Sequence, residues 1–246
     1  MLIALFADIH ANREAFSACL AHAQTIGAER IVLLGDYVGY GADPGWAVDE
    51  VMRLVETGAV AVRGNHDEAV FNPDTGMNET AQTAIDWTRD KLSTAQRDFL
   101  RSLPLTVEDG ERLYVHASAH RPGDWEYVIG ADAAQRSFLA TSRHVTLCGH
   151  VHVPELYHFS ATGKLASFTP GADVALPFSP QRRWLAVLGA VGQPRDGIPA
   201  ACYGLLDDVE NTLTYVRVPY DVAGAAKKIT AAGLPPVLGL RLLSGR

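Results

Sequence analysis

The N-terminal half of the chain alternates short apolar runs with segments of helical periodicity. The runs Leu2–Ala7, Arg30–Leu34 and Ala59–Val62 are of strand length and apolar at most positions, as expected for strands that are buried on both faces of a sheet. Apolar residues at helical spacing separate the runs, following the candidate N-cap Asn12 and the Asp43-Pro44 pair. The pattern predicts two successive parallel β-α-β crossovers.

The predicted elements change at Pro104, from helices before it to mainly strands after it. Residues from about 66 to 103 are expected to be helical, and Ser93-x-x-Gln96 has the form of a capping box. Beyond them we expect strands at Arg112–Val115, Val145–Cys148, Glu155–Phe159, Leu165–Thr169, Trp184–Val191, Ala201–Leu206 and Leu213–Val218, with helices around Ala131–Ala140 and Val222–Ala232. The Pro- and Gly-rich stretch Thr169–Pro180 is expected to be a loop, and without a repeat or linker the 246 residues are expected to form a single domain.

Composition and charge exclude several classes of protein. The chain is 48% hydrophobic and 20% charged, which is typical of a soluble globular protein and not of a disordered one. Lys and Arg number 21 against 28 Asp and Glu, a net charge of −7, so nonspecific binding to nucleic acid is not expected. A phosphate substrate stays open, because bound metal ions can reverse the local sign of a site.

The cysteines and the apolar runs indicate a cytoplasmic protein. The three cysteines are odd in number and lie within apolar segments, which favours buried free thiols and a reducing compartment. No stretch reaches the roughly 20 apolar residues of a membrane span. The first apolar run ends at Asp8 and His10 without a basic region before it, unlike a signal peptide. The oligomeric state is left open.

Residues capable of binding metal follow the predicted strands. They are Asp8 and His10 after the first, Asp36 after the second, Asn65, His66 and Asp67 after the third, His116 after Arg112–Val115, and His150 and His152 after Val145–Cys148. In open α/β sheets the functional crevice lies beyond the carboxyl ends of the strands. We therefore expect these side chains to converge.

The ligand types suggest two metal ions. Oxygens of Asp and Asn together with His nitrogens suit borderline divalent ions such as Mn, Fe, Zn, Co or Ni. Three Asp or Asn oxygens and four His nitrogens make seven ligands, which are too many for one tetrahedral zinc ion, whereas two ions about 3.5–4 Å apart form a clamp suited to displacement at phosphorus. The chain contains neither GxGxxG nor GxxxxGK[ST], so dehydrogenases and P-loop enzymes are not expected.

Five ordered motifs give the chain a family resemblance. They are DIH (Asp8–His10), GDYVGYG (Gly35–Gly41), GNHD (Gly64–Asp67), VHAS (Val115–Ser118) and GHVH (Gly149–His152). In this order they resemble the calcineurin-like metallophosphoesterases. The segments GDYVGYGADP and GQPRDG are similar to the small prokaryotic phosphodiesterase branch of that superfamily. The resemblance implies a four-layer α/β/β/α sandwich, with two mixed sheets flanked by helices.

The same resemblance assigns roles to the candidate residues. It implies that a first metal is held by Asp8, His10 and His152, that Asp36 bridges, and that a second metal is completed by Asn65, His116 and His150. Manganese is the favoured ion. His66 would stand beside the metals and protonate the departing oxygen, a role that contributes about 10²–10⁴-fold to a rate.

One motif departs from the family pattern. Protein phosphatases of the superfamily carry GDxVDRG, in which the second Asp orients the catalytic His and the Arg grips phosphate. Gly39 and Tyr40 occupy those positions here, which favours diesters over dianionic monoesters. Arg63 and Arg195 are the candidates for a replacement cation that binds the substrate. What orients His66 is left open.

The leading hypothesis is a dinuclear metal-dependent phosphodiesterase, in which a metal-bridging hydroxide attacks phosphorus and His66 acts as general acid. A dinucleoside polyphosphate hydrolase, a protein phosphatase and a non-catalytic metal-binding scaffold are the alternatives. The substrate is expected to be a small phosphate ester, with nucleotides among the candidates. Trp125 and Tyr127 could stack on a nucleotide base or pack in the core.

Overall fold

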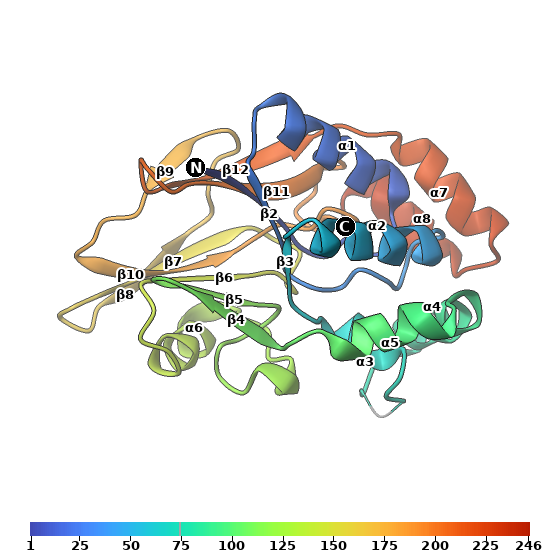
Figure 1. Cartoon of the computed structure of the whole chain (residues 1–246), viewed down its shortest axis with the longest axis horizontal. Helices are drawn as coiled ribbons and strands as arrows, with labels where there is room; N and C mark the ends of the chain where they lie inside the picture. Colours follow the sequence, from blue (N-terminus) through green and yellow to red (C-terminus); the bar gives the residue numbers. More distant parts are fainter. Residues whose placement is uncertain (74) are drawn as a thin grey trace.

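Two mixed β-sheets packed face to face form the centre of the molecule, and helices cover their outer faces (Figure 1). The computed structural model describes residues 1–73 and 75–246. Within these residues each sheet has six strands. The predicted four-layer α/β/β/α arrangement is confirmed.

The first sheet joins the two ends of the chain. Its strands, in spatial order, are β3 (Val60–Ala61), β2 (Arg30–Leu33), β1 (Leu2–Phe6), β11 (Ala201–Asp207), β12 (Thr212–Val218) and β9 (Ala175–Pro177). The strands β1, β2 and β3 are parallel, as the crossover pattern predicts, and β11 pairs antiparallel with β1.

The second sheet is built from the middle of the chain. Its order is β4 (Thr106–Asp109), β5 (Arg112–Val115), β6 (Val145–Cys148), β10 (Arg182–Val187), β7 (Glu155–Ser160) and β8 (Leu165–Phe168). The strands β5, β6 and β10 are parallel, and the remaining pairs are antiparallel.

The helices begin at residues suited to that position. They are α1 (Arg13–Thr25), α2 (Pro44–Glu56), α3 (Asn65–Ala69), α4 (Glu79–Lys91), α5 (Thr94–Ser102), α6 (Gly130–Leu139), α7 (Val222–Ala231) and α8 (Pro236–Ser244), with a short 3₁₀ turn η1 at Pro122–Asp124. The Asn12 side chain caps α1 by accepting a hydrogen bond from the Ala15 amide, and the predicted capping box of Ser93 and Gln96 opens α5.

Alternation along β1 explains the layers. Ile3 and Leu5 belong to the core between the sheets, whereas Ala4 and Phe6 point to the opposite face and pack in the core beneath the helices. Phe6 meets Phe16 of α1 edge to face at 5.6 Å. A strand that is buried on both faces must be apolar at every position, so the run is continuous.

Three local expectations differ from the structure. The segment expected to be helical from 66 to 103 is divided among α3, α4 and α5, without helix at residues 71–73 and 75–78. The stretch Thr169–Pro180, expected to be a loop, contains β9, which pairs with β12. β4 was not expected at all. Both of these strands lie at sheet edges and depend on a partner strand, which local sequence does not reveal.

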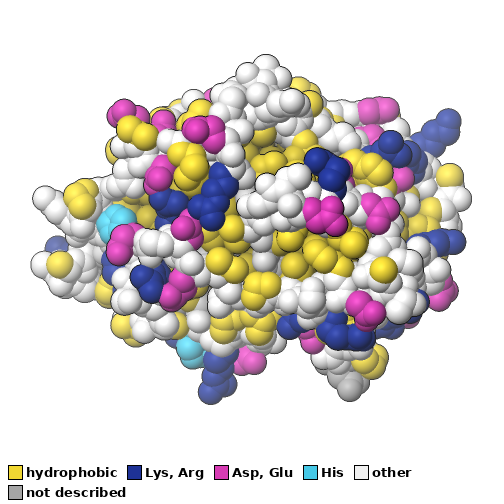
Figure 2. All heavy atoms as spheres, in the orientation of Figure 1, with side chains coloured by type: hydrophobic (Ala, Val, Ile, Leu, Met, Phe, Trp, Pro, Cys, Tyr) yellow, Lys and Arg dark blue, Asp and Glu magenta, His cyan; other side chains and the backbone are white. Residues whose placement is uncertain are grey.

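The surface carries mixed charge. On the face shown in Figure 2, Lys and Arg side chains are interspersed with Asp and Glu. Among the described residues, no helix combines the length and the apolar character that crossing a membrane requires.

Tyr37 joins the ends of two strands. It is fully buried, and its hydroxyl donates to the carbonyl oxygens of Val62 at 2.6 Å and Leu33 at 3.1 Å. Tyr37→Phe leaves the buried Val62 carbonyl without that donor, while the Leu33 carbonyl keeps the hydrogen bond from the Val62 amide at 3.0 Å, so we expect the free energy of unfolding to fall by about 1–3 kcal/mol. Urea denaturation followed by tryptophan fluorescence measures the change.

Tyr203→Phe is the matched control. Its hydroxyl bonds at 2.8 Å to the ring of His22, which is only half-buried, so water can replace the lost partner and a smaller effect is expected. Equal losses in the two variants would contradict the role given to Tyr37.

Candidate metal centre

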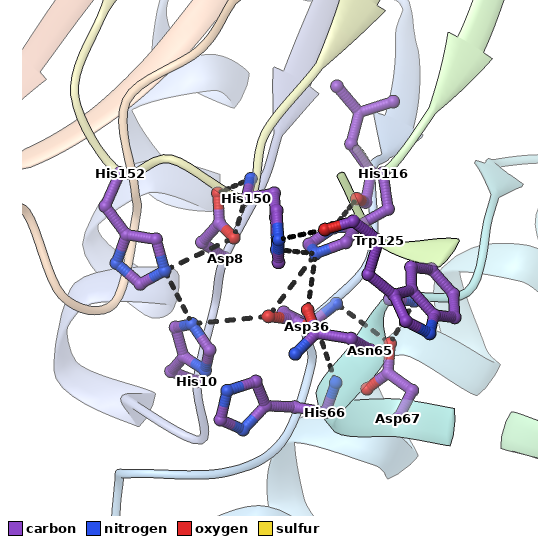
Figure 3. A network of polar contacts seen from close by, with 12 residues as sticks. Asp8, His10, Asp36, Asn65, His66, Asp67, His116, Trp125, His150 and His152 are labelled. Atoms are coloured by element: carbon purple, nitrogen blue, oxygen red, sulfur yellow. Dashed lines mark hydrogen bonds and ion pairs between the residues drawn. The ribbon is translucent and has the colours of Figure 1, made fainter. Parts of the chain in front are cut away.

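The loops that follow five strands meet at one place (Figure 3). Three of these strands, β1, β2 and β3, are parallel in the first sheet, and β5 and β6 are parallel in the second. The structure brings together all seven candidate ligands, which are Asp8, His10, Asp36, Asn65, His116, His150 and His152. Convergence at the carboxyl ends of strands is thus found in both sheets.

The first group of ligand atoms consists of Asp8, His10, Asp36 and His152. The Nε2 atoms of His10 and His152 lie 3.0 Å apart. His152 Nε2 is 3.5 Å from Asp8 Oδ1, and His10 Nε2 is 3.6 Å from Asp36 Oδ2. All four side chains are buried.

The second group shares Asp36 with the first and adds His116 and His150. His116 Nε2 lies 3.4 Å from Asp36 Oδ2 and 3.1 Å from His150 Nδ1. The amide oxygen of Asn65 is 3.1 Å from the same Nε2 atom. Asp36 therefore stands between two groups of potential ligands.

Main-chain carbonyl groups fix the orientation of the four imidazoles in these groups. The pairs are His10 Nδ1 with Val38 O at 3.0 Å, His116 Nδ1 with Leu34 O at 2.7 Å, His152 Nδ1 with Gln193 O at 2.7 Å, and His150 Nε2 with Trp125 O at 3.0 Å. A carbonyl oxygen only accepts, so the ring nitrogen facing it carries the proton. The second nitrogen of each ring then faces the centre, the usual arrangement of metal-ligating histidines.

The backbone at these positions is unusual. Several candidate ligands have positive φ angles, namely Asp8 at 55°, His10 at 48°, Asp36 at 57°, His150 at 69° and His152 at 64°. Residues with a Cβ atom rarely adopt this left-handed region, and such strain persists where the surrounding structure imposes it. Here it turns the chain sharply after β1, β2 and β6, so that the side chains point into the centre.

Burial controls the charge of these groups. It raises the pKa of Asp8 to about 7 and lowers the pKa values of His10 and His152 well below the ordinary histidine value. Burial also opposes protonation of His116, but the Asp36 carboxylate outweighs it and raises the pKa of His116 to about 9. The centre therefore favours added positive charge beside Asp36.

The donor set fits two divalent ions. His10 and His152 are neutral, and the Nδ1–H group of each donates a hydrogen bond to a main-chain carbonyl. Their Nε2 lone pairs therefore face each other. Two lone pairs at this separation repel unless a cation lies beside them. Imidazole nitrogens with carboxylate and amide oxygens suit borderline divalent ions. Together the two groups could hold two such ions with Asp36 shared.

His66 differs from the four ligand histidines. Its Nδ1 is buried and has no hydrogen-bond partner among the described residues. Its ring packs against those of Tyr40 at 4.5 Å and His10 at 4.8 Å. A Cβ atom on Gly39 would lie 2.2 Å from His66 Nδ1, so only glycine leaves room for the ring. Packing thus positions the imidazole, while its amide donates to Asp36 Oδ1 at 2.8 Å.

The Asp67 carboxylate binds main-chain amides of the loops and does not orient the His66 ring. Its carboxylate accepts hydrogen bonds from the amides of Asp36, Tyr37 and Gly64 at 2.8–2.9 Å. In Figure 3 it lies on the far side of Asn65 from the His66 ring. The carboxylate therefore fixes the turn that presents Asp36.

The two candidate cations lie in different surroundings. Arg63 pairs with Glu68 at 3.0 Å and donates to the Arg101 carbonyl at 2.8 Å, outside the centre. Arg195 lies over the ring of Tyr40, with its Cζ 5.6 Å from the ring centroid. Burial and the nearby His116 and Asp36 have larger effects on the pKa values of Asp8 and His66, and the positive charge of Arg195 adds a smaller lowering effect.

Sequence reasoning missed the carbonyl groups of Val38, Leu34, Gln193 and Trp125. A main-chain carbonyl has no residue signature, so the chain carries no signal for it. Only the GQPRDG segment offered a hint, because Gln193 lies within it.

Comparisons with known proteins agree with this geometry. The sequence profile of the calcineurin-like phosphoesterase superfamily domain matches residues 1–211. An uncharacterized protein of Methanocaldococcus jannaschii is 34% identical over 251 residues, covering 100% of this chain and 98% of that protein. The crystal structure of a metallophosphoesterase from Sphaerobacter thermophilus has 34% identity and a TM-score of 0.88, covering 100% of this chain and 99% of that one. A hypothetical protein from Pyrococcus horikoshii OT3 shares the fold at 19% identity, with a TM-score of 0.78 and coverage of 100% and 98%.

We expect divalent metal to stabilise the fold, because it offsets the burial of carboxylates beside neutral imidazoles. At a free concentration 1,000 times the dissociation constant, binding contributes about 4 kcal/mol. This corresponds to a rise of roughly 10 °C in melting temperature for a chain of this size. Calorimetry of chelator-treated protein titrated with Mn²⁺ measures the shift.

Asp36→Asn is expected to lose most of this shift, because both groups share the carboxylate. Asp98→Asn is the control, since Asp98 forms an exposed pair with Arg101 that contributes little to stability. A full shift in Asp36→Asn would contradict a shared ligand.

Proposed function

Because the chain belongs to the calcineurin-like phosphoesterase superfamily, we propose that it is a hydrolase of phosphodiesters that uses two divalent metal ions. The family implies a metal-dependent phosphoester hydrolase; the preference for diesters is the finer proposal. One observation carries it. The buried ring of Tyr40 packs against His66, and the guanidinium group of Arg195 lies over the Tyr40 ring. One such cation complements the single charge of a diester better than the double charge of a monoester.

The proposed ligands are those of the two groups. Asp8, His10 and His152 would hold one ion, Asn65, His116 and His150 the other, and Asp36 both, with manganese as the favoured metal. When bound, such ions neutralise charge on phosphoryl oxygens and lower the pKa of coordinated water. The main-chain carbonyl groups that bind the opposite ring nitrogens keep the ligating nitrogens facing the centre.

His66 is the proposed general acid. Burial lowers its pKa to about 4, so the free imidazole is neutral at neutral pH. Negative charge beside the ring favours the protonated form, and a bound phosphate ester brings that charge. The imidazole thus takes up a proton from water, transfers it to the departing oxygen and returns to its neutral form. Packing by Tyr40 and His10 holds the ring in place for this transfer.

Arg195 is the proposed contact to phosphate. Its Nη2 donates to Gln193 Oε1 at 3.1 Å, while its buried Nε has no hydrogen-bond partner among the described residues. A phosphoryl oxygen would satisfy that donor. Arg63 is left out of the proposal, because its guanidinium is already engaged by Glu68 and the Arg101 carbonyl.

The testing experiment compares hydrolysis of bis-p-nitrophenyl phosphate with that of the p-nitrophenyl monoester in the presence of manganese. We expect a higher kcat/KM for the diester, and near-complete loss of both activities in Asp36→Asn. Preference for the monoester would overturn the diester proposal and direct attention to Arg195 as a stronger phosphate contact. Activity that persists unchanged in Asp36→Asn would overturn the metal-dependent mechanism.

His66→Ala separates proton transfer from metal binding. We expect kcat to fall by about 10²–10⁴-fold, the usual contribution of a general acid. Metal content, measured by mass spectrometry of the purified protein, should stay at the wild-type level. Loss of metal in this variant would mean that His66 is a ligand, and the proposed role would be wrong.

A further inference from the structure

A cleft of about 350 Å³ opens beside the candidate metal centre. Asn65, His66 and His150 line it on the side of the centre. Tyr40, Trp125 and Tyr127 add three aromatic rings to its lining. Small-molecule sites typically have this size and combine apolar or aromatic walls with a few polar groups. We call this space the aromatic cleft.

Tyr127 is an exposed ring held in a fixed orientation. Its phenol stacks on the imidazole of His150, with centroids 4.0 Å apart and planes at 22°. It is nonetheless 49% exposed. Large aromatic side chains usually gain most from burial. A ring that stays half exposed while it is stacked in one orientation offers a ready platform for another planar group.

The loop that carries the rings is strained and tied to the centre. Arg121 and Trp125, on either side of η1, have positive φ angles of 48° and 56°. The Trp125 carbonyl accepts the hydrogen bond from His150 Nε2 at 3.0 Å, and its indole meets the His116 ring at 6.0 Å. Strain of this kind clusters at ligand-binding sites. The loop therefore presents its aromatic residues at a set distance from the reacting group.

The place of His66 decides which part of a substrate the cleft would take. A general acid must reach the oxygen of the leaving group, and His66 lines the aromatic cleft. The leaving group therefore lies in this cleft, and the remaining substituent of the diester lies outside it. This step rests on the proposed function.

We propose that the aromatic cleft binds a nucleoside as the leaving group, with its base stacked on Tyr127. Stacking on aromatic side chains is a general way of holding a base. The cleft is also lined by Asp124 and by Thr75, whose buried hydroxyl has no hydrogen-bond partner among the described residues, and these polar groups suit the edge of a base and the sugar hydroxyls. A lipid chain would find these groups unsuitable, since it cannot satisfy their hydrogen bonds.

The position of the nucleoside then determines which bond to phosphorus breaks. Water adds to phosphorus as a hydroxyl group and releases one proton to the solvent, and the bond between phosphorus and the nucleoside oxygen breaks. His66 gives its proton to that oxygen, so that a neutral nucleoside departs and a phosphate monoester of the other substituent remains. A base bound on the opposite side would instead yield a nucleotide.

The first test measures binding of nucleosides without phosphate. Isothermal calorimetry on the metal-loaded protein uses adenosine, guanosine, cytidine and uridine as probes. We expect at least one to bind, and Tyr127→Ala to weaken that binding by about tenfold, the effect of losing one base–aromatic stack. Tyr127→Phe keeps the ring and should bind as the wild type does. Phe168→Ala removes another exposed ring, 41% exposed on β8, and should have no effect.

The second test follows the products of a matched pair of substrates. One is the methyl phosphodiester of the best-binding nucleoside at its 5′ oxygen, and the other is the same diester of 1-deoxyribose, which lacks the base. We expect a lower KM for the first and release of free nucleoside with methyl phosphate. Release of the nucleoside monophosphate with methanol would overturn the proposal, as would equal KM values together with no nucleoside binding.

The two proposals fail in different ways. If diesters are hydrolysed but no nucleoside binds, the nucleoside proposal is overturned and the phosphodiesterase stands. If nucleosides bind in a Tyr127-dependent manner but no diester is hydrolysed, the proposed function fails and the binding site stands.

Discussion

Burial of ionisable groups at one point is the constraint on which the rest of the centre depends. Asp8, His10, Asp36, His116 and His152 are almost completely removed from water. Carboxylates in such surroundings are costly unless positive charge lies beside them. The raised pKa of His116 supplies part of this positive charge, because the Asp36 carboxylate favours the protonated imidazole. Divalent ions would meet the same demand more fully.

The backbone determines the orientation of the side chains at the centre. Four carbonyl groups orient four imidazoles, and left-handed turns after the strands aim the side chains inward. Asp67 anchors three amides of these turns. Glycine is needed where the loops cross closely, as at Gly64, where a Cβ atom would lie 2.2 Å from Asp36 Oδ1. The motif glycines thus serve packing at the centre.

Gly39 and Tyr40 shape the space around the His66 ring. Glycine lets the His66 ring occupy the space where a side chain would stand, and Tyr40 packs on that ring. The cation beside them comes instead from Arg195, more than 150 residues later in the chain. The segment that carries Arg195 also orients His152 through the Gln193 carbonyl. The proposed phosphate contact and the orientation of a candidate metal ligand therefore come from the same loop.

The four layers were expected from the family resemblance of the motifs, whereas the residues themselves predicted the parallel crossovers and which side chains gather at the strand ends. These last two predictions follow from local periodicity and from the rule that parallel strands end on one edge. The tertiary structure alone decided the edge strands β4 and β9, the different surroundings of Arg63 and Arg195, the anchoring role of Asp67, and the aromatic cleft. These features depend on backbone carbonyls, ring packing and pairing between distant segments, such as His150 with Trp125 and Tyr127. Such contacts are fixed by the assembled fold, and residue types along the chain do not encode them individually.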